Sequence, residues 1–499
     1  MNSTLASAAT QPGADVTATE TPEIRETHTG MVVLVGDRAY KGKKPIVTDF
    51  LDFSTVALRE EACDREVRLN SRMEADSYFG VAHLTDPGGG QSEPVVVMRR
   101  YPDSRRLASM VRRNEPVEGH LSAIAKRLAA FHSEAIRSAE VDDCARVPAI
   151  AARWQENLTE LRRNAGTLLD VDVLDEVARL ATRFIDGRAA LFASRIVERR
   201  IVDGHGDLIA DDVFCLRSGP VLLDCLEFDD ALRYVDGLDD AAFLAMDLEF
   251  LGRRDLGAFF LEEYRRRAQD QAPASLAHFY IAYRAVVRAK VDCIKAAQGV
   301  HHAAVDAGRH LDMAVQHLRA GTVQLILVGG GPGTGKTTLA RALGERLPAQ
   351  VISSDDVRRE MQAEGELDGD AGIQDAGLYS PDKVDAVYTT MLRRARLLLG
   401  NGQSVIMDGT WRDPRHRTRA RQLGHEGHCA TVELACTVPL EEAMTRISNR
   451  PKGASDATPQ IASAMALDVH DWREARHIDT SQPLGDSVAE AQELCCLAI

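Results

Sequence analysis

The chain has 499 residues, of which 44% are hydrophobic and 27% are charged, and its formal net charge is −15. One hydrophobic core seldom serves a chain of this length, so we expect two or more domains. The acidic balance argues against nucleic acid and anionic membrane surfaces as partners. The chain contains no run of about 18 apolar residues, so we expect no transmembrane helix. The 9 cysteines are scattered without a C-x-x-C pair, which is typical of reduced thiols in a cytoplasmic protein.

The first part of the chain combines a polar tail with strand and helix signals. Residues 1–28 are rich in Ala, Thr, Ser and Glu and lack the apolar core of a secretory signal, so we expect a mobile tail. Residues 31–47, MVVLVGDRAYKGKKPIV, have a Gly-Asp turn after an apolar run and predict a β-hairpin. Helical spacing over 55–73 predicts a helix, and the β-branched run in 93–102 predicts a strand that ends at a proline.

The rest of the chain changes from a helical to an alternating pattern. Helical spacing dominates from about 105 to 200 and from 229 to 319, and from 323 onward strand-like and helical stretches alternate, which predicts a parallel α/β sheet. We therefore expect a kinase-like domain over 29–319 and a P-loop domain over 320–499, that is, a mixed α/β and α+β fold class. Strands of the second domain are expected at LILV and in AQVISSD, QSVIMDGT, CATVELACTV and ARHID.

The strongest motif is GGPGTGKT, which fits G-x-x-x-x-G-K-[ST] and stands between an apolar strand and a helical stretch. Glycines let backbone N–H groups turn toward phosphate oxygens, and the following helix presents its positive end to the same anion. We expect Lys336 to reach the β- and γ-phosphates of ATP and Thr337 to bind Mg²⁺. The predicted nucleotide-binding residues are Gly330, Gly331, Pro332, Gly333, Thr334, Gly335, Lys336, Thr337 and Thr338.

Transfer of phosphate to a hydroxyl also needs a carboxylate on the acceptor side, a metal ligand and positive charge. Asp355 could orient or deprotonate the hydroxyl and Arg358 could hold the acceptor, while Asp408 ends a strand at a place suited to a metal ligand. Arg446 and Arg450 are four residues apart and predict a lid over the phosphates. The alternative is structural, because an Asp at a strand end often caps a helix and helical arginines are usually solvated.

With these residues, 323–499 resembles the small P-loop kinases of the gluconate-kinase, chloramphenicol-phosphotransferase, zeta-toxin and polynucleotide-5′-kinase type. The resemblance rests on the P-loop and on SDDVR at 354–358. It implies phosphoryl transfer to a hydroxyl of a small molecule and leaves the acceptor open. The arginine-rich stretch WRDPRHRTRARQ could instead contact nucleic-acid phosphates, as in a 5′-hydroxyl kinase.

Upstream, HGDLIADDVF begins like the catalytic loop of a phosphotransferase, and residues 31–317 resemble the aminoglycoside-phosphotransferase-like kinases. The domain order resembles that of bacterial proteins that join such a kinase to a P-loop kinase. The resemblance implies a phosphate-binding lysine in AYKGKKP, either Lys41 or Lys44, and we favour Lys41. It further implies that Glu66 pairs with that lysine and that Met98 and Arg100 border the adenine.

The same resemblance assigns the catalytic loop. Asp207 is expected to orient the acceptor hydroxyl and accept its proton, Asp224 to bind Mg²⁺, and Asp236 and Asp240 to fix the loop. Asp212 stands where such kinases have a metal-binding Asn. A carboxylate is still a hard oxygen ligand, but its added negative charge could misplace the metal or raise a neighbouring pKa.

Together these motifs predict an ATP-dependent phosphotransferase with Mg²⁺ at both sites and with Asp207, Asp355 and Lys336 as its catalytic residues. A different class also fits, namely a regulatory protein in which ATP binding changes the conformation and little turnover occurs. The sequence leaves open the acceptor, the activity of the first domain and whether the chain forms a homo-oligomer.

Overall fold

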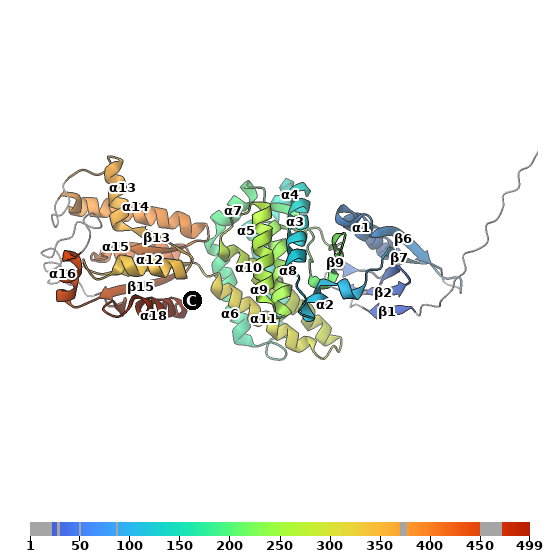
Figure 1. The fold of residues 1–499 in the computed structure, drawn as a ribbon. Coiled ribbons are helices and arrows are strands. Elements are labelled where there is room, and N and C mark those ends of the chain that lie inside the picture. The colour runs from blue at the N-terminus through green and yellow to red at the C-terminus, as the bar shows by residue number, and fades with distance from the viewer. Residues whose placement is uncertain (1–21, 27–29, 49–50, 86–87, 370–376, 450–471) are drawn as a thin grey trace, which may run out of the picture. The chain divides into compact units, whose positions relative to one another are not determined.

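The computed structural model describes residues 22–26, 30–48, 51–85, 88–369, 377–449 and 472–499 (Figure 1). The chain divides into two compact units, one made of residues 1–115 and 210–230, the other of 116–209 and 231–499. The predicted fold class, mixed α/β with a parallel-sheet P-loop domain at the end, is confirmed. The expected boundary at 320 falls inside the second unit, and each unit is described below by itself.

The first unit contains an antiparallel five-stranded sheet in the order β1-β2-β3-β7-β6. The predicted hairpin is confirmed as β2 and β3, and the predicted strand is confirmed as β7. The expected tail is wrong at Glu23–Glu26, which pairs with β2 as strand β1, while residues 1–21 and 27–29 lie outside the described part. The strands are β1 (Glu23–Glu26), β2 (Gly30–Val35), β3 (Arg38–Lys43), β6 (Tyr78–Leu84) and β7 (Glu93–Arg99).

Helix α1 (Val56–Glu74) covers this sheet and confirms the predicted helix. Thr55 caps it by accepting a hydrogen bond from the Leu58 N–H over 3.3 Å. The core of the unit joins residues of α1, the sheet and the segment after the catalytic loop. The remaining elements are β4 (Val47–Thr48), β5 (Leu51–Asp52), η1 (Asp103–Arg105), α2 (Leu107–Arg112), η2 (Ala210–Asp212), β9 (Val213–Leu216) and β10 (Gly219–Leu222).

The second unit begins with a helical region, as the spacing predicts. Stacked aromatic rings fill its centre, with the centroids of Phe184 and Phe279 4.4 Å apart. Among the described residues, no helix is both long and apolar enough to cross a membrane. The elements are α3 (Glu118–Glu134), α4 (Ala139–Asp143), α5 (Val147–Arg162), α6 (Val171–Gly187), α7 (Ala189–Val197), β8 (Ile201–Asp203), β11 (Tyr234–Asp236), α8 (Gly237–Phe250), α9 (Arg254–Ala268), α10 (Ala274–Ala297) and α11 (Ala303–Ala320).

The P-loop domain follows within the same unit. Its five strands are all parallel, in the order β13-β14-β12-β15-β16, and every strand predicted for it is present. Alternate residues of β12 face helices α12 and α18, which pack against each other in one apolar cluster (Figure 1). The elements are β12 (Gln324–Gly329), α12 (Lys336–Arg346), β13 (Ala349–Ser353), α13 (Ser354–Ala363), η3 (Gly377–Tyr379), α14 (Pro381–Gly400), β14 (Ser404–Asp408), α15 (Pro414–Glu426), β15 (Ala430–Thr437), α16 (Leu440–Ser448), β16 (Arg476–Asp479) and α18 (Leu484–Leu497).

Buried Arg188, between α6 and α7, links the helical region to the P-loop domain inside this unit. Its guanidinium donates hydrogen bonds to the carbonyls of Leu399 and, over 3.0 Å, of Gly427. These carbonyls lie at the C-terminal ends of α14 and α15, where a helix leaves carbonyl groups unpaired and carries partial negative charge. The backbones of Gly187 and Gly427 are in close contact here, since a Cβ added to Gly187 would lie only 2.5 Å from the Gly427 carbonyl oxygen.

Replacing Arg188 with Met should lower the free energy of unfolding by about 1–3 kcal/mol, because each carbonyl would lose its charged donor and keep only a weaker one, the Gly402 N–H for Leu399 and the Cys429 thiol for Gly427. The measurement is the urea midpoint of the full chain. Arg179→Met is the control, since the half-exposed Arg179 gives one hydrogen bond to the Ile499 carbonyl. Equal urea midpoints for the two variants would contradict the prediction that the hydrogen bonds of Arg188 stabilise the fold.

A second stability prediction concerns two histidines near the start of the P-loop domain. The Nδ1 atoms of His278 and His317 lie 2.9 Å apart, and Nε2 of His317 lies 3.0 Å from a carboxylate oxygen of Glu249. Burial, and then the neighbouring His317 and Arg254, lower the pKa of His278 from 6.5 to about 4. As the pH falls, the unfolded chain therefore binds this proton before the folded chain does.

The stability that His278 contributes is fully present above pH 6.5 and is lost as the pH falls toward 4. Between these values, the free energy of unfolding of the wild type should fall by as much as about 3 kcal/mol more than that of His278→Gln. Urea unfolding at stepped pH measures this difference. Exposed His425→Gln is the control and should keep the wild-type slope.

Candidate active site

The predicted nucleotide-binding residues form one loop between β12 and α12. Gly330, Gly333 and Gly335 have φ angles of 143°, 80° and 78°, a backbone region that favours glycine. At Gly333 a side chain is also excluded by space, because a Cβ would lie 2.5 Å from the Ala443 carbonyl oxygen. The loop runs directly into α12, which begins at Lys336, so backbone N–H groups and the helix N-terminus are available to phosphate oxygens.

Two residues predicted to bind metal meet beside this loop. The Thr337 hydroxyl donates a hydrogen bond to Oδ2 of Asp408 over 2.7 Å. Asp408 is buried, and its Oδ1 atom makes no hydrogen bond to any residue that the structure describes. Burial raises the pKa of Asp408, and the charge of Lys336 opposes this shift. A buried carboxylate oxygen left free beside a hydroxyl fits the oxygen ligands that Mg²⁺ prefers.

The predicted acceptor residues lie together at the start of α13. Arg358 is buried and donates a hydrogen bond to Asp355 over 2.7 Å. Its guanidinium also lies 4.3 Å from the centre of the Tyr379 ring. The charge of Asp355 raises the pKa of Asp408, which indicates that the two carboxylates are neighbours. Asp355 and Arg358 thus neutralise each other, a pairing that the sequence did not predict.

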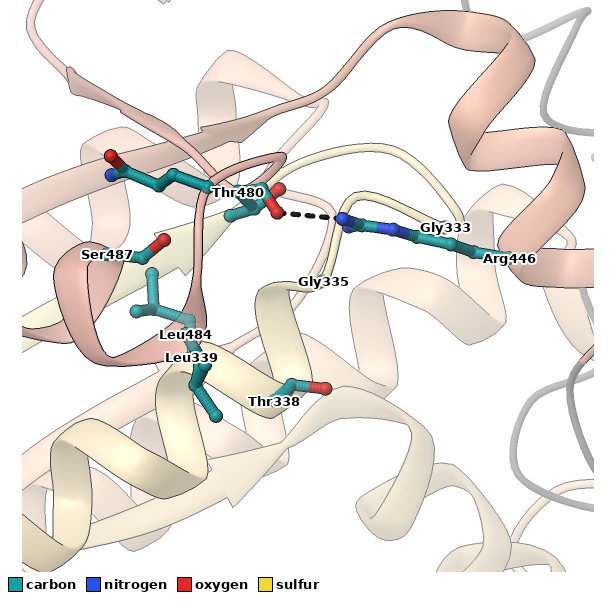
Figure 2. Close-up of a pocket in the computed structure, with 9 residues that line it drawn as sticks. Gly333, Gly335, Thr338, Leu339, Arg446, Thr480, Leu484 and Ser487 are labelled. Atoms are coloured by element: carbon teal, nitrogen blue, oxygen red, sulfur yellow. Dashed lines mark hydrogen bonds between the residues drawn. The ribbon is translucent and has the colours of Figure 1, made fainter.

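The predicted lid residue Arg446 borders a cavity of about 370 Å³ next to the P-loop (Figure 2). Arg446 donates a hydrogen bond to the Thr480 carbonyl over 2.8 Å, and the Thr480 hydroxyl donates to the Thr334 carbonyl over 2.7 Å. Arg450, the second predicted lid residue, lies outside the described residues. No motif in the sequence marks the other residues that line the cavity, which are Leu339, Gln482, Leu484 and Ser487.

In the first unit, a buried cluster of charges surrounds Lys41. Lys41 lies 3.0 Å from Glu66 and is also paired with Asp224, as the favoured prediction requires. Burial alone would lower the pKa of Lys41, but the nearby carboxylates, Asp224 first, raise it well above its usual value. The other candidate, Lys44, pairs instead with Glu26 over 2.6 Å.

Two members of this cluster were missed from the sequence. Lys43 lies 2.6 Å from Glu66 and also pairs with Glu227. Alternation along β3 could have indicated Lys43, because it shares a face of the strand with Lys41. Glu227 carried no local signal. Carboxylate oxygens of Glu66, Asp224 and Glu227 lie within 4.8 Å of one another, which suits a hard divalent cation.

The predicted catalytic loop, residues 205–214, is divided between the two units, so its residues are placed separately. Asp212 ends η2 in the first unit, and its carbonyl accepts a hydrogen bond from the Leu223 N–H over 3.0 Å. Asp207 is half-buried in the second unit.

The prediction that Asp240 fixes the loop is confirmed. Its carboxylate accepts hydrogen bonds from the N–H groups of His205 and Gly206 over 2.7 and 2.8 Å. The same prediction for Asp236 is wrong. Asp236 caps α8 by accepting from the Leu238 N–H over 2.9 Å and is held by Arg195, so its carboxylate is already engaged away from the loop.

The arginine-rich stretch is largely neutralised within the P-loop domain. Arg415 pairs with Asp413, Arg419 with Asp385, and Arg421 with Glu433. Arg417 is buried and donates to the Trp411 carbonyl over 2.7 Å. Paired arginines offer little charge to a phosphate backbone, so the stretch does not favour the nucleic-acid alternative.

Known proteins resemble the two parts of the chain to different extents. Residues 325–469 match the model of a family described as an AAA domain. Adenylate kinase from Pyrococcus furiosus is 34% identical over 129 residues, which cover 25% of this chain and 56% of that protein. A choline/ethanolamine kinase family protein from Mesorhizobium loti has a TM-score of 0.37 and 14% identity, and the match covers 61% of this chain and 94% of that one.

One relationship extends over nearly the whole chain. Uncharacterized protein Rv2004c from Mycobacterium tuberculosis is 56% identical over 477 residues, which are 96% of each protein. Uncharacterized protein Mb2027c from Mycobacterium bovis matches to the same extent. At this identity and coverage, the chain belongs to the same family as these two mycobacterial proteins.

Proposed function

We propose that the P-loop domain transfers the γ-phosphoryl group of ATP to a hydroxyl of a small molecule. The observation that carries the proposal is the 2.7 Å contact between Thr337 and Asp408, next to Lys336 at the start of α12. This contact combines a phosphate-binding loop with a free buried carboxylate oxygen. The match to the AAA domain and the similarity to an adenylate kinase support a nucleotide-dependent transfer.

In this proposal, each residue has a separate task. Lys336 and the N-terminus of α12 bind the β- and γ-phosphates and stabilise the charge that develops during transfer. Thr337 and Asp408 would hold Mg²⁺, which supplies further charge neutralisation when it is bound. The cavity beside Arg446 and Thr480 is contiguous with the loop and takes the nucleoside.

The chemical step is a displacement at the γ-phosphorus. The acceptor oxygen forms a bond to phosphorus while the bond to the β-phosphate oxygen breaks, and ADP leaves. Asp355 accepts the proton that the acceptor hydroxyl loses. Because Arg358 already donates a hydrogen bond to this carboxylate, it keeps Asp355 oriented before the acceptor binds.

The kinase-like part is proposed as a second ATP site that also needs Mg²⁺. Lys41 would bind phosphates, Glu66 would orient Lys41, and Asp224 with Asp212 would hold the metal. Asp207 would take the proton of a second acceptor hydroxyl. We further propose that the protein works in the cytoplasm on small molecules, without a nucleic-acid partner.

Lys336→Ala should reduce acceptor-dependent release of ADP by about 100-fold or more, because the γ-phosphate would lose its main counter-charge. The assay supplies [γ-³²P]ATP, Mg²⁺ and a small-molecule extract of cells as the acceptor pool. Exposed Lys126→Ala is the charge-matched control and should behave as the wild type. If Lys336→Ala transferred phosphate as fast as the wild type, the proposal that the P-loop domain catalyses the transfer would be wrong.

The kinase-like part is tested in the Lys336→Ala background. If it is an active second site, the transfer that remains should depend on Asp207 and fall about 100-fold or more in Lys336→Ala/Asp207→Asn. Addition of Asp211→Asn is the control, because Asp211 lies in the same loop and has no assigned role. Identical rates for the double and single variants would show that this part does not catalyse transfer. ATP-dependent stabilisation without transfer would then favour the regulatory function.

A further inference from the structure

The turn that follows β14, Gly409–Trp411, has an unusual backbone. Trp411 has a φ angle of 51° although it is not glycine, and its side chain is fully buried. A bulky residue in this backbone region is uncommon and strained, so the surrounding structure must hold it there. The strained residue stands three positions after Asp408, the proposed metal ligand.

Hydrogen bonds fix Trp411 at three points. Its backbone N–H donates to the Tyr388 hydroxyl over 3.1 Å, and its ring N–H donates to the Met407 carbonyl over 3.1 Å. Arg417 donates to its carbonyl over 2.7 Å. Tyr388 is itself fixed, because its ring stacks on His416 with the centroids 4.2 Å apart. The turn is therefore held by groups from α14, α15 and β14.

Space in the turn is equally restricted at Gly409. A Cβ at this position would lie 2.7 Å from the Tyr388 hydroxyl oxygen, so the backbone and Tyr388 are in direct contact. Between Gly409 and Trp411, Thr410 is half-buried, and its Oγ1 lies 3.4 Å from the same hydroxyl. The strained turn thus leaves one side-chain hydroxyl, that of Thr410, partly accessible.

The neighbours of Gly409 show which part of the domain this turn lies against. A Cβ on Gly409 would lie 3.5 Å from the Ser354 Oγ atom, and Ser354 directly precedes the acceptor residue Asp355. The turn therefore lies next to the start of α13, which carries Asp355 and Arg358. Thr410, beside Tyr388 and two residues after Asp408, lies in the same region.

Resting on the proposed function, we propose that the Thr410 hydroxyl binds the acceptor molecule and that Tyr388 is the positioning residue that holds it there. A Thr hydroxyl both donates and accepts, so it suits a hydroxyl or another polar oxygen of the acceptor. With Asp355 and Arg358, the acceptor side then offers a hydroxyl and a neutral ion pair. This set recognises a polyhydroxylated small molecule without requiring that it carry charge.

The test uses variants that change the hydroxyl and keep the shape. The full chain is assayed with [γ-³²P]ATP, Mg²⁺ and a dilution series of the cell extract of small molecules. Thr410→Val should raise the extract concentration at half-maximal transfer by about tenfold, as expected for one lost hydrogen bond. Thr410→Ser should stay near the wild type, and Tyr388→Phe should have an intermediate effect.

Other readouts separate acceptor binding from a structural role. Affinity for a non-hydrolysable ATP analogue and the melting temperature should be unchanged in Thr410→Val. Thr389→Val is the control, because it removes an exposed hydroxyl on α14 that donates to the Asp385 carbonyl and accepts from the Arg419 guanidinium. Thr389→Val should retain wild-type transfer and the wild-type extract dependence.

Two results would overturn the proposal for Thr410 while leaving the proposed function intact. One is a Thr410→Val variant whose transfer depends on the extract concentration as in the wild type. The other is a Thr410→Val variant that also binds the ATP analogue more weakly or melts at a lower temperature, because the residue would then have a structural role. A wild-type chain that transfers no phosphate from ATP to the extract would instead overturn the proposed function, and the role of Thr410 with it.

Discussion

The parallel pairing of β14 with β12 on one side and β13 on the other is the constraint on which the P-loop site depends. In this register Asp408 lies opposite Val328, just before the P-loop, and opposite Ser353, just before Asp355. The ends of three consecutive strands therefore bring the P-loop, the buried carboxylate of Asp408 and the segment with Asp355 and Arg358 to one edge of the sheet. A register shift of one residue would turn the Asp408 side chain to the other face and separate it from Thr337.

In the first unit, buried ion pairs bring the residues of the predicted site together. Glu66 is fully buried, and a buried carboxylate is costly unless it is paired. Lys41 and Lys43, on the same face of β3, both lie within ion-pair distance of Glu66, and they extend the pairing to Asp224 and Glu227. The cluster thus ties a strand, a helix and the segment after the catalytic loop to one another. Loss of a single member would leave its partners buried with unbalanced charge.

Much of this arrangement could be predicted from the sequence wherever the information is local. The P-loop and the parallel strands follow from short patterns whose physical basis is backbone geometry and strand periodicity, whereas the pairing of Lys41 with Glu66 is implied only by the resemblance to the aminoglycoside-phosphotransferase-like kinases. The pairing of Glu227, the engagement of Asp236 by Arg195 and the strand at Glu23–Glu26 depend on partners far along the chain. No local pattern specifies such partners, because the choice among several carboxylates or strand edges is made by tertiary packing.

Helix α14 shows why the P-loop domain is not independent of the helical region that precedes it. Its C-terminal end is held by Arg188 through the Leu399 carbonyl, and Tyr388 lies about three turns earlier on the same helix. A hydrogen-bonded helix of this length is stiff, so the position of its end constrains the position of Tyr388. Tyr388 in turn supports the strained turn that contains Thr410. The turn that contains Thr410 is therefore supported by contacts that reach from α14 to residues before the P-loop domain begins.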